Sequence, residues 1–388
     1  MIRLLEGGQI FLSDGTWETA DILIENDRIC RIGQNLRREI GSIRAGIEEI
    51  VPLAGRMVLP GLCDLHIHGA GGWDICDEHP DAISHIADYL ASVGVTSFLP
   101  TTMAMNAGDL ARTISRIADS MRSSSRGARV LGAHIEGPYA APTRVGVQRI
   151  DVIRAPSVEE IREIMSHYTN VIRIIDIAPE IDGTIEFCRE LKHELILSVS
   201  HTDASYEECT EIFHAGATHA THLFNAMSGL NHRSPGVVGA VLDSPSVTAE
   251  LICDGIHIHP AVLRIVFQIL GDRAVIVSDA MRATGRGDGI FDLGGQTIRV
   301  KKGRTIGPAG GLAGSVTTLL PAMRNLRDYG IPLEQIIRAG SMNPARVIGD
   351  KDCIGGIREG NRADLLITEE NLKLRMTIIG GCVCYRDE

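Results

Sequence analysis

Histidines and carboxylates at the ends of strand-like segments are the residues of this chain that could carry chemistry. His66 and His68 close one such segment two positions apart, so both rings can point to the same face of a strand. Glu136, His201 and His222 each close or follow another segment. One His-x-His motif is weak evidence, but its combination with three more such residues favours a site for one or two divalent cations.

A metal site of this kind would suit hydrolysis. A bound divalent cation lowers the pKa of water from about 16 to near 7, which makes a nucleophile available at neutral pH. Asp279 follows a further strand-like run and would bring another carboxylate to the same place. Burying this group of side chains without a cation would be costly. Imidazole and carboxylate ligands accept zinc, iron, manganese or cobalt, and of these we expect zinc.

These residues need a fold that gathers strand ends at one place. Apolar runs alternate with amphipathic helical segments, which predicts an α/β protein. Eight strands over about 280 residues match a (β/α)8 TIM-like barrel, whose strands all end at one mouth. An open doubly wound sheet is the alternative that periodicity leaves open. The predicted strands are 58–66, 95–99, 130–136, 171–177, 195–200, 218–222, 247–253 and 274–278, and the predicted helices include 81–93, 109–121, 158–168, 184–193, 206–215 and 260–270.

Short polar residues mark where several of these helices should begin. Asn106, Ser157, Asp182 and Ser205 each stand near the start of a predicted helix. Their side chains can accept hydrogen bonds from the backbone N–H groups of the first turn, which have no partner within the helix. We therefore predict all four residues as N-caps.

The two ends of the chain are predicted to form one small β domain. Residues 21–29 contain two short strands around an Asn-Asp turn, which is typical of a hairpin. Strand candidates return at 363–367 and 373–379. Separate halves would leave exposed sheet edges, so we expect the termini to pair in a small β-sandwich. The predicted division is 1–57 and 351–388 for the sandwich, and 58–350 for the catalytic barrel.

The remaining histidines have less direct predicted roles. His219 lies three positions before the candidate ligand of the sixth strand, so the two rings face opposite sides and only one can be a ligand. His134 is predicted as a hydrogen-bonded core residue beneath the metal. His257 and His259 follow the seventh strand and could both face the mouth. The histidines on helical or loop segments, predicted to lie at the surface, are His79, His85, His167, His193 and His214.

Composition limits the partners of this chain. Its 388 residues carry a formal net charge of −11, which would repel nucleic acid and anionic membrane surfaces. It contains no run of 18 apolar residues, and because its first residues lack a long apolar stretch we expect no secretory leader. Nine scattered cysteines without a zinc-type pair indicate reduced thiols. We therefore expect a cytoplasmic protein that binds neither nucleic acid nor a membrane surface.

Five stretches of sequence carry a family resemblance: 60–69, 134–139, 221–227, 278–280 and 312–315. Together they resemble the metal-dependent amidohydrolase superfamily and, within it, the family that deacetylates N-acetylglucosamine 6-phosphate. That family places its acidic metal ligand after the third strand, as this chain does at position 136. The resemblance covers nearly the whole chain and implies a barrel flanked by a small β-sandwich made from both chain ends.

The resemblance implies a role for each candidate residue. Glu136, His201 and His222 match the principal metal site of the family, and Asp279 matches its catalytic acid/base. A second metal site, present in only some members, is matched by His66 and His68.

The residues that match substrate contacts are Asn225, the backbone of Ala226, Arg233 and His257. Arg233 resembles an arginine that reaches across a homodimer interface to the sugar phosphate; from its position alone it could equally be a solvated loop residue. Gln148 stands where single-metal members have a histidine that polarises the amide carbonyl. Because glutamine cannot become cationic, we expect a second metal to supply the missing polarisation.

The implied reaction converts N-acetylglucosamine 6-phosphate into glucosamine 6-phosphate and acetate. One alternative is another amidohydrolase, such as a deacetylase of N-acetylgalactosamine 6-phosphate or a cyclic-amide hydrolase, because loop residues decide the substrate. A second alternative is a non-catalytic metal-binding protein, which would have no need for Asp279.

Overall fold

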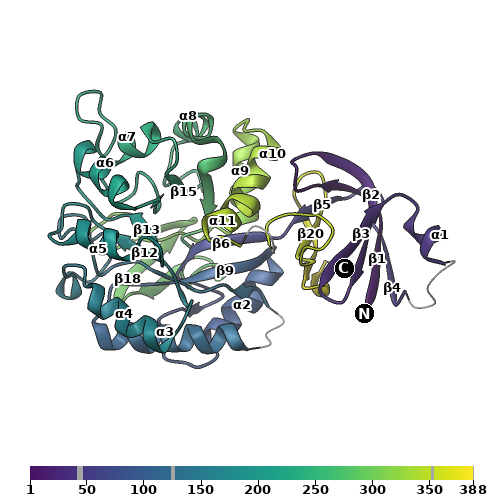
Figure 1. Ribbon diagram of the computed structural model, residues 1–388, viewed down its shortest axis with the longest axis horizontal. Helices are drawn as coiled ribbons and strands as arrows, with labels where there is room; N and C mark the ends of the chain where they lie inside the picture. Colours follow the sequence, from purple (N-terminus) through teal and green to yellow (C-terminus); the bar gives the residue numbers. More distant parts are fainter. Residues whose placement is uncertain (42–46, 124–126, 351–353, 388) are drawn as a thin grey trace.

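The computed structural model describes residues 1–41, 47–123, 127–350 and 354–387, which form two lobes (Figure 1). The larger lobe contains a barrel of parallel strands surrounded by helices. The smaller lobe is built from β-strands and contains both ends of the chain. The α/β class and the pairing of the two termini, both predicted from the sequence, are confirmed.

Eight parallel strands form the barrel, and each pairs with its neighbours in the order of a (β/α)8 fold. The sheet closes where Ile67 at the end of the first strand bridges to Ala280 after the last one, and the Asp279 N–H donates to the His66 carbonyl at 2.9 Å. This closure excludes the open doubly wound sheet. The barrel strands are β6 (Leu62–Ile67), β9 (Val95–Thr102), β11 (Ala133–Ile135), β12 (Ile172–Ile177), β13 (Ile196–Val199), β14 (His219–Ala220), β15 (Thr248–Ile252) and β16 (Ala274–Val277), with β10 (Arg129–Val130) as a short addition beside β9.

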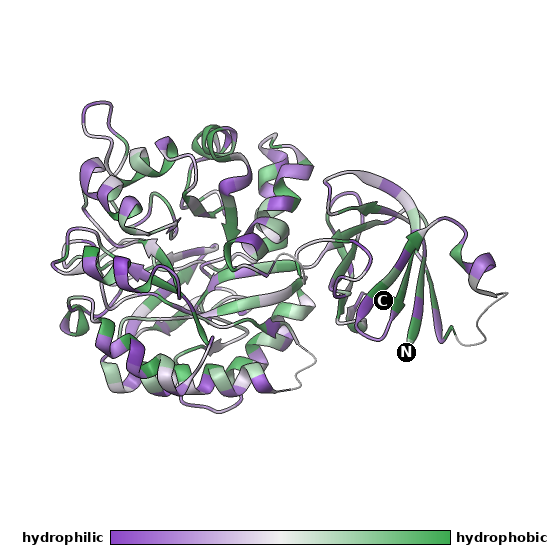
Figure 2. Ribbon diagram, in the orientation of Figure 1, coloured by the Kyte–Doolittle hydropathy of each residue, from purple (hydrophilic) through white to green (hydrophobic). Residues whose placement is uncertain are grey.

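Amphipathic helices cover the barrel with their apolar faces turned inward (Figure 2). In α2 (Ala82–Ser92), for example, Ile83, Ile86 and Leu90 are buried at helical spacing. No helix in the described part of the chain is long and apolar enough to cross a bilayer. The other main helices are α3 (Ala107–Arg122), α4 (Val158–His167), α5 (Thr184–Leu191), α6 (Tyr206–Ala215), α7 (Gly236–Asp243), α8 (Pro260–Leu270), α9 (Leu319–Asp328), α10 (Leu333–Ile337) and α11 (Asn343–Val347).

Three of the four predicted N-caps are confirmed and one is wrong. The side chains of Asn106, Ser157 and Ser205 accept hydrogen bonds from the backbone N–H three residues later. Asp182 does not cap α5, because Gly183 occupies the N-cap position in a left-handed conformation with φ of 86°. Glycine adopts this conformation without the steric cost that a side chain would bring.

The small lobe is one eight-stranded sheet made from both termini. Strands from the C-terminus add to β5 at one side, and the N-terminal hairpin lies at the other. Apolar residues of β2, β3 and β21, including Ile24, Ile29 and Met376, share one core. The division at residues 57 and 351 stays a prediction. The strands are β1 (Ile2–Phe11), β2 (Trp17–Glu25), β3 (Arg28–Gly33), β4 (Glu49–Pro52), β5 (Met57–Pro60), β20 (Leu365–Thr368), β21 (Leu374–Ile379) and β22 (Cys382–Arg386), with the short helix α1 (Leu36–Gly41) after β3.

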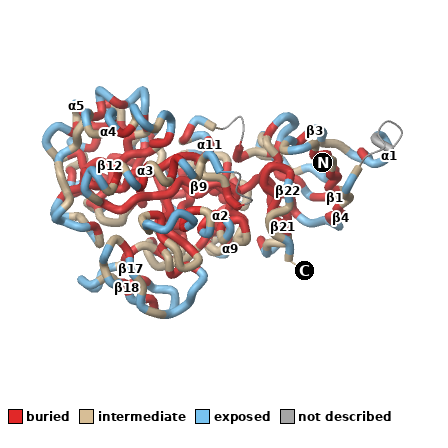
Figure 3. The backbone as a smooth tube through the Cα atoms, turned by 90° about the horizontal axis from the view of Figure 1, so that it is seen from below, coloured by how far each residue is buried: buried red, intermediate tan, exposed pale blue. Residues whose placement is uncertain are grey.

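A three-stranded sheet that the sequence did not lead us to expect lies between β16 and α9. It consists of β17 (Gly289–Leu293), β18 (Gln296–Lys301) and β19 (Arg304–Ile306), and it projects from the barrel lobe (Figure 3). Its buried side chains pack against Met103 and Met281, which follow β9 and β16. The insertion therefore covers the barrel at the carboxyl ends of its strands.

The cap at Ser205 can be tested by substitution. Its hydroxyl accepts from the Glu208 N–H, and the Glu208 carboxylate accepts from the Ser205 N–H, so two free donors are satisfied. We expect Ser205→Ala to lower the free energy of unfolding by about 1 kcal/mol in urea denaturation. Asp182→Ala is the matched control and should change it by less than about 0.5 kcal/mol. An equal decrease in the free energy of unfolding in the two variants would contradict the assignment of the caps.

Candidate metal centre and active site

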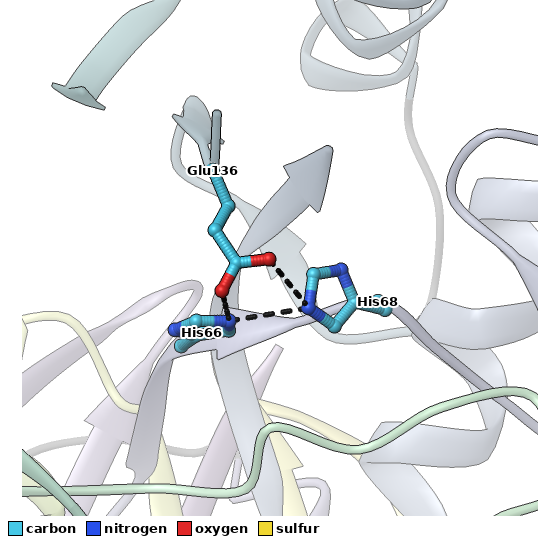
Figure 4. Close-up of side chains that lie close together, drawn as sticks. All are labelled: His66, His68 and Glu136. Atoms are coloured by element: carbon cyan, nitrogen blue, oxygen red, sulfur yellow. Dashed lines mark hydrogen bonds and ion pairs between the residues drawn. The ribbon is translucent and has the colours of Figure 1, made fainter. Parts of the chain in front are cut away.

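Two histidines from the first barrel strand meet a carboxylate from the third (Figure 4). The Nε2 atoms of His66 and His68 lie 3.2 Å apart. His66 Nε2 is 3.5 Å from Glu136 Oε1, and His68 Nε2 is 3.3 Å from Glu136 Oε2. The two-residue period of β6 and its extension brings both rings to the inner face, as predicted.

Two further histidines approach the same carboxylate from the fifth and sixth strands. His201 Nε2 lies 3.2 Å from Glu136 Oε1, and His222 Nε2 lies 3.0 Å from that oxygen. The two Nε2 atoms are 3.2 Å apart. Glu136 is therefore shared by four imidazole rings, and all five residues are buried.

Asp279 follows the eighth strand and completes the cluster. Its Oδ1 lies 3.4 Å from His68 Nε2 and 3.6 Å from His66 Nε2. Its side chain also borders the cavity at the mouth of the barrel, so it touches both the cluster and the space open to a ligand. The structure thus gathers all six residues that the sequence placed at strand ends.

Three of these residues adopt a backbone conformation that is unfavourable for residues other than glycine. The φ angles of His201, His222 and Asp279 are 43°, 32° and 47°, in the left-handed region. Such a conformation costs about 1–3 kcal/mol for each residue and persists only where surrounding contacts enforce it. Each residue lies two positions after the last residue of its barrel strand, and its side chain joins the cluster.

The electrostatics of the cluster favour anionic carboxylates. Burial opposes ionisation of Glu136, but the charge of His68 and hydrogen bonds from His201 and His222 outweigh it, so its pKa lies well below the ordinary value. Burial also opposes ionisation of Asp279, whose pKa is nevertheless lowered by the hydrogen bond from His68. Burial disfavours the charged form of His222, yet Glu136 raises its pKa to about 9. The site therefore demands positive charge beside its carboxylates, from imidazolium protons or a bound cation.

The donor set fits a divalent metal. His66, His68 and Glu136 form one group of three ligand atoms within 4.8 Å of each other, and Glu136, His201 and His222 form another. Imidazole nitrogen and carboxylate oxygen are ligands for zinc and neighbouring transition metals. The outer nitrogens of His68 and His201 lie 3.2 Å and 2.8 Å from the backbone carbonyls of Thr101 and Arg144. Such contacts are typical of histidines that bind metal through the other nitrogen.

Gln148 lies beside this cluster. Its side-chain amide donates to Glu136 Oε2, and its carbonyl oxygen accepts from the Ala104 N–H at 2.6 Å. Both bonds hold the amide at the edge of the cavity, with its second N–H left as a possible donor.

A cavity of about 320 Å³ opens above the cluster. Asn225, Ala226 and His257, which we predict to contact substrate, line this cavity. His257 Nδ1 is held by Asp254 Oδ2 at 2.7 Å, so its ring has a fixed orientation. Arg233 is different: it is exposed in the loop before α7, beside His232, and does not line the cavity of its own chain.

The remaining histidines follow the predictions with one exception. His134 is buried, with Nε2 2.9 Å from Asp176, and the five helical and loop histidines are exposed. His219 is buried away from the cavity, so His222 alone of that pair joins the cluster. The prediction that His259 could face the mouth is wrong, because its ring caps α8 by accepting from the Ala261 N–H.

Sequence reasoning missed one charged residue of this region. Glu250 lies in the middle of β15 and is completely buried. Its carboxylate lies 2.9 Å from His66 Nδ1 and 3.2 Å from His219 Nε2. Burial opposes its ionisation, but the charge of His66 and the bond from His219 hold its pKa well below the ordinary value. A lone glutamate within the apolar run 247–253 was the available indication.

Comparison with known proteins identifies relatives over most of the chain. The sequence profile of the amidohydrolase family matches residues 57–384. The N-acetylglucosamine-6-phosphate deacetylase of Vibrio furnissii is 34% identical over 339 residues, which cover 87% of this chain and 85% of the relative. The N-acetylgalactosamine-6-phosphate deacetylase of Escherichia coli O157:H7 is 32% identical over 327 residues, which cover 84% and 87%.

Solved structures share the whole fold. N-acetylglucosamine-6-phosphate deacetylase from Thermotoga maritima is 31% identical, with a TM-score of 0.88 and coverage of 99% of this chain and 100% of that one. A mutant of N-acetyl-D-glucosamine-6-phosphate deacetylase from Mycobacterium smegmatis, in complex with N-acetyl-D-glucosamine-6-phosphate, is 29% identical, with a TM-score of 0.89 and coverage of 99% of both chains. The sequence profile, the relatives and the shared barrel all agree with the resemblance found in the sequence, and the chain belongs to the amidohydrolase family.

Proposed function

We propose that this chain is a metal-dependent hydrolase that removes the acetyl group from N-acetylglucosamine 6-phosphate, releasing acetate and glucosamine 6-phosphate. The observation that carries the proposal is the buried Glu136 carboxylate, which four imidazoles and Asp279 surround at the mouth of the barrel. The relatives named above support the substrate, because they cover most of the chain and deacetylate amino-sugar phosphates. Cyclic-amide hydrolysis has no such support.

In the proposed reaction, Glu136, His201 and His222 would hold one divalent cation, and His66 and His68 would hold a second with Glu136. A divalent cation supplies Lewis acidity, which makes water more acidic and polarises an amide carbonyl. We favour zinc, with iron, manganese or cobalt as alternatives.

The chain's own residues would move the proton and position the amide. Asp279 would accept a proton from the attacking water and return it to the nitrogen of the departing amine, so that acetate and a free amine result. The second N–H of Gln148 would donate to the carbonyl oxygen as its negative charge develops. Burial keeps both groups fixed before the substrate arrives.

The sugar phosphate would lie against Asn225, the Ala226 backbone and His257, which line the cavity. Arg233 would serve the phosphate of a partner subunit in a homodimer, since its guanidinium lies outside its own cavity. An arginine can bind two phosphate oxygens in parallel, which would help an anion approach a protein of net charge −11. We also propose that the enzyme is cytoplasmic.

The galactosamine epimer is the second candidate substrate, because one relative acts on N-acetylgalactosamine 6-phosphate at similar identity. The two sugars differ at one hydroxyl group. A panel of both sugars, each with and without the 6-phosphate, decides between them: we expect the highest kcat/KM for N-acetylglucosamine 6-phosphate. A preference for the galactosamine epimer would overturn this part of the proposal.

The role of Asp279 gives the first prediction for activity. Asp279→Asn removes the proton acceptor while keeping the shape of the side chain, so kcat should fall about 10²- to 10⁴-fold. The measurement is acetate release by metal-quantified protein, with the circular dichroism spectrum as the control for folding. Activity near that of the wild type would remove Asp279 from the mechanism.

The role of Arg233 predicts a difference between substrates. Arg233→Ala should raise KM for the phosphorylated sugar about 10- to 100-fold, because a charged hydrogen-bonded contact is lost. KM for the unphosphorylated sugar should change little. The matched control is Arg189→Ala, on the exposed surface of α5, which should leave both KM values unchanged. An equal effect of Arg233→Ala on the two sugars would show that Arg233 does not bind phosphate.

The two groups of ligands predict how many metal ions the protein holds. Mass spectrometric metal analysis should find more than one divalent ion per chain, and His68→Ala should lower that number by up to one. His85→Ala, which removes an exposed imidazole stacked on Trp73, is the control and should keep the wild-type content. A maximum of one ion in the wild-type protein would leave His66 and His68 without the proposed role.

A further inference from the structure

Glu250 is a buried carboxylate that contacts the candidate metal centre without belonging to it. It lies on β15, has no exposed surface and does not line the cavity. Its Oε2 lies 2.9 Å from His66 Nδ1 and accepts the backbone N–H of His222 at 3.2 Å. Its Oε1 lies 3.2 Å from His219 Nε2. One side chain therefore joins β6 to β14 and to the turn that follows β14.

We propose that Glu250 is a positioning residue of the metal centre, which orients the His66 ring and holds the turn that presents His222. This inference rests on the proposed metal centre but not on the proposed sugar substrate.

The contact with His66 fixes which ring nitrogen can bind a cation. A carboxylate is an acceptor only, so the His66 Nδ1 that faces it must carry the hydrogen. The lone pair of a neutral ring then lies on Nε2, which faces Glu136 at 3.5 Å and His68 at 3.2 Å. A carboxylate behind a ligand histidine also makes that histidine more basic and a stronger ligand.

Glu250 also accepts two hydrogen bonds from the strained turn at His222. The side chain of Glu250 accepts from the His222 N–H, and its backbone carbonyl accepts from the Leu223 N–H at 2.9 Å. His222 has a φ of 32°, a conformation that needs contacts to maintain it. Two consecutive hydrogen bonds to one residue of the next strand supply such contacts and direct the His222 ring toward Glu136.

His66 differs from the other candidate ligands in the partner of its Nδ1 atom. The outer nitrogens of His68 and His201 face backbone carbonyls, and Nδ1 of His222 has no hydrogen-bond partner within the described chain. Among these four rings, His66 is thus the one with a carboxylate behind it. Loss of Glu250 should therefore weaken metal binding first at the site that contains His66.

Asp176 provides a matched control in the same barrel interior. It lies on β12, is 1% exposed, and contacts His134 Nε2 at 2.9 Å and the Thr221 hydroxyl at 2.7 Å. It has no described bond to the side chain of His66, His68, Glu136, His201 or His222, the ligands of the proposed metal centre. Asp176→Asn therefore shows what the loss of any buried barrel carboxylate does.

The test is a zinc titration of the metal-stripped full-length protein by isothermal calorimetry, in the absence of sugar. The variants are Glu250→Gln, Glu250→Asp and Asp176→Asn, with Tm recorded for each. Glu250→Gln keeps the size but loses the charge, and Glu250→Asp keeps the charge but shortens its reach to His66. We expect both to weaken the binding of one zinc ion per chain about 10- to 100-fold, whereas Asp176→Asn retains wild-type affinity.

Each outcome decides the inference. Wild-type affinity in either foldable Glu250 variant would overturn it, and so would an equal loss in Asp176→Asn, which would indicate a general effect of the barrel core. If Glu250→Gln fails to fold, Glu250→Asp gives the answer alone. A wild-type protein that binds no zinc would overturn the metal centre and this inference with it. The zinc titration contains no sugar, so it does not depend on the proposed substrate. The deacetylation itself is tested separately, by measuring acetate release from the sugar by the wild-type enzyme.

Discussion

The structure depends on the sharing of one buried carboxylate, Glu136, by four imidazole rings. The Nε2 atoms of these rings lie 3.0–3.5 Å from its two oxygens. Such a group cannot be buried cheaply unless its charges are compensated. The hydrogen bonds and charges of the histidines keep Glu136 anionic, and this negative charge in turn favours a cation between the rings. The barrel is the frame that makes this convergence possible, because it brings ligands from four strands to one axis.

Holding the cluster together requires strain and a second layer of polar residues. His201, His222 and Asp279 adopt left-handed backbone conformations two residues after the ends of their strands. Beneath them, Glu250 connects to His66, to the His222 turn and to His219. The interior of this barrel is therefore polar near the site, whereas its outer face packs against the apolar faces of amphipathic helices (Figure 2).

Much of this arrangement could be predicted from the sequence, because strand periodicity and the polar residues at strand ends are local features. His66 and His68 could be placed on one face from their spacing alone. Glu250 could not, since a single glutamate in an apolar strand does not reveal which ring it faces. The cap of α5 depended on the left-handed φ of Gly183 rather than on Asp182. The position of Arg233 relative to any substrate depends on quaternary structure, which no single chain displays.

The most direct test of the shared carboxylate is anomalous X-ray diffraction at the zinc edge from crystals grown with zinc. We expect two anomalous peaks next to Glu136, one about 2.0–2.2 Å from Nε2 of both His66 and His68, and one at that distance from Nε2 of both His201 and His222. A map without a peak within coordination distance of Glu136 would contradict it.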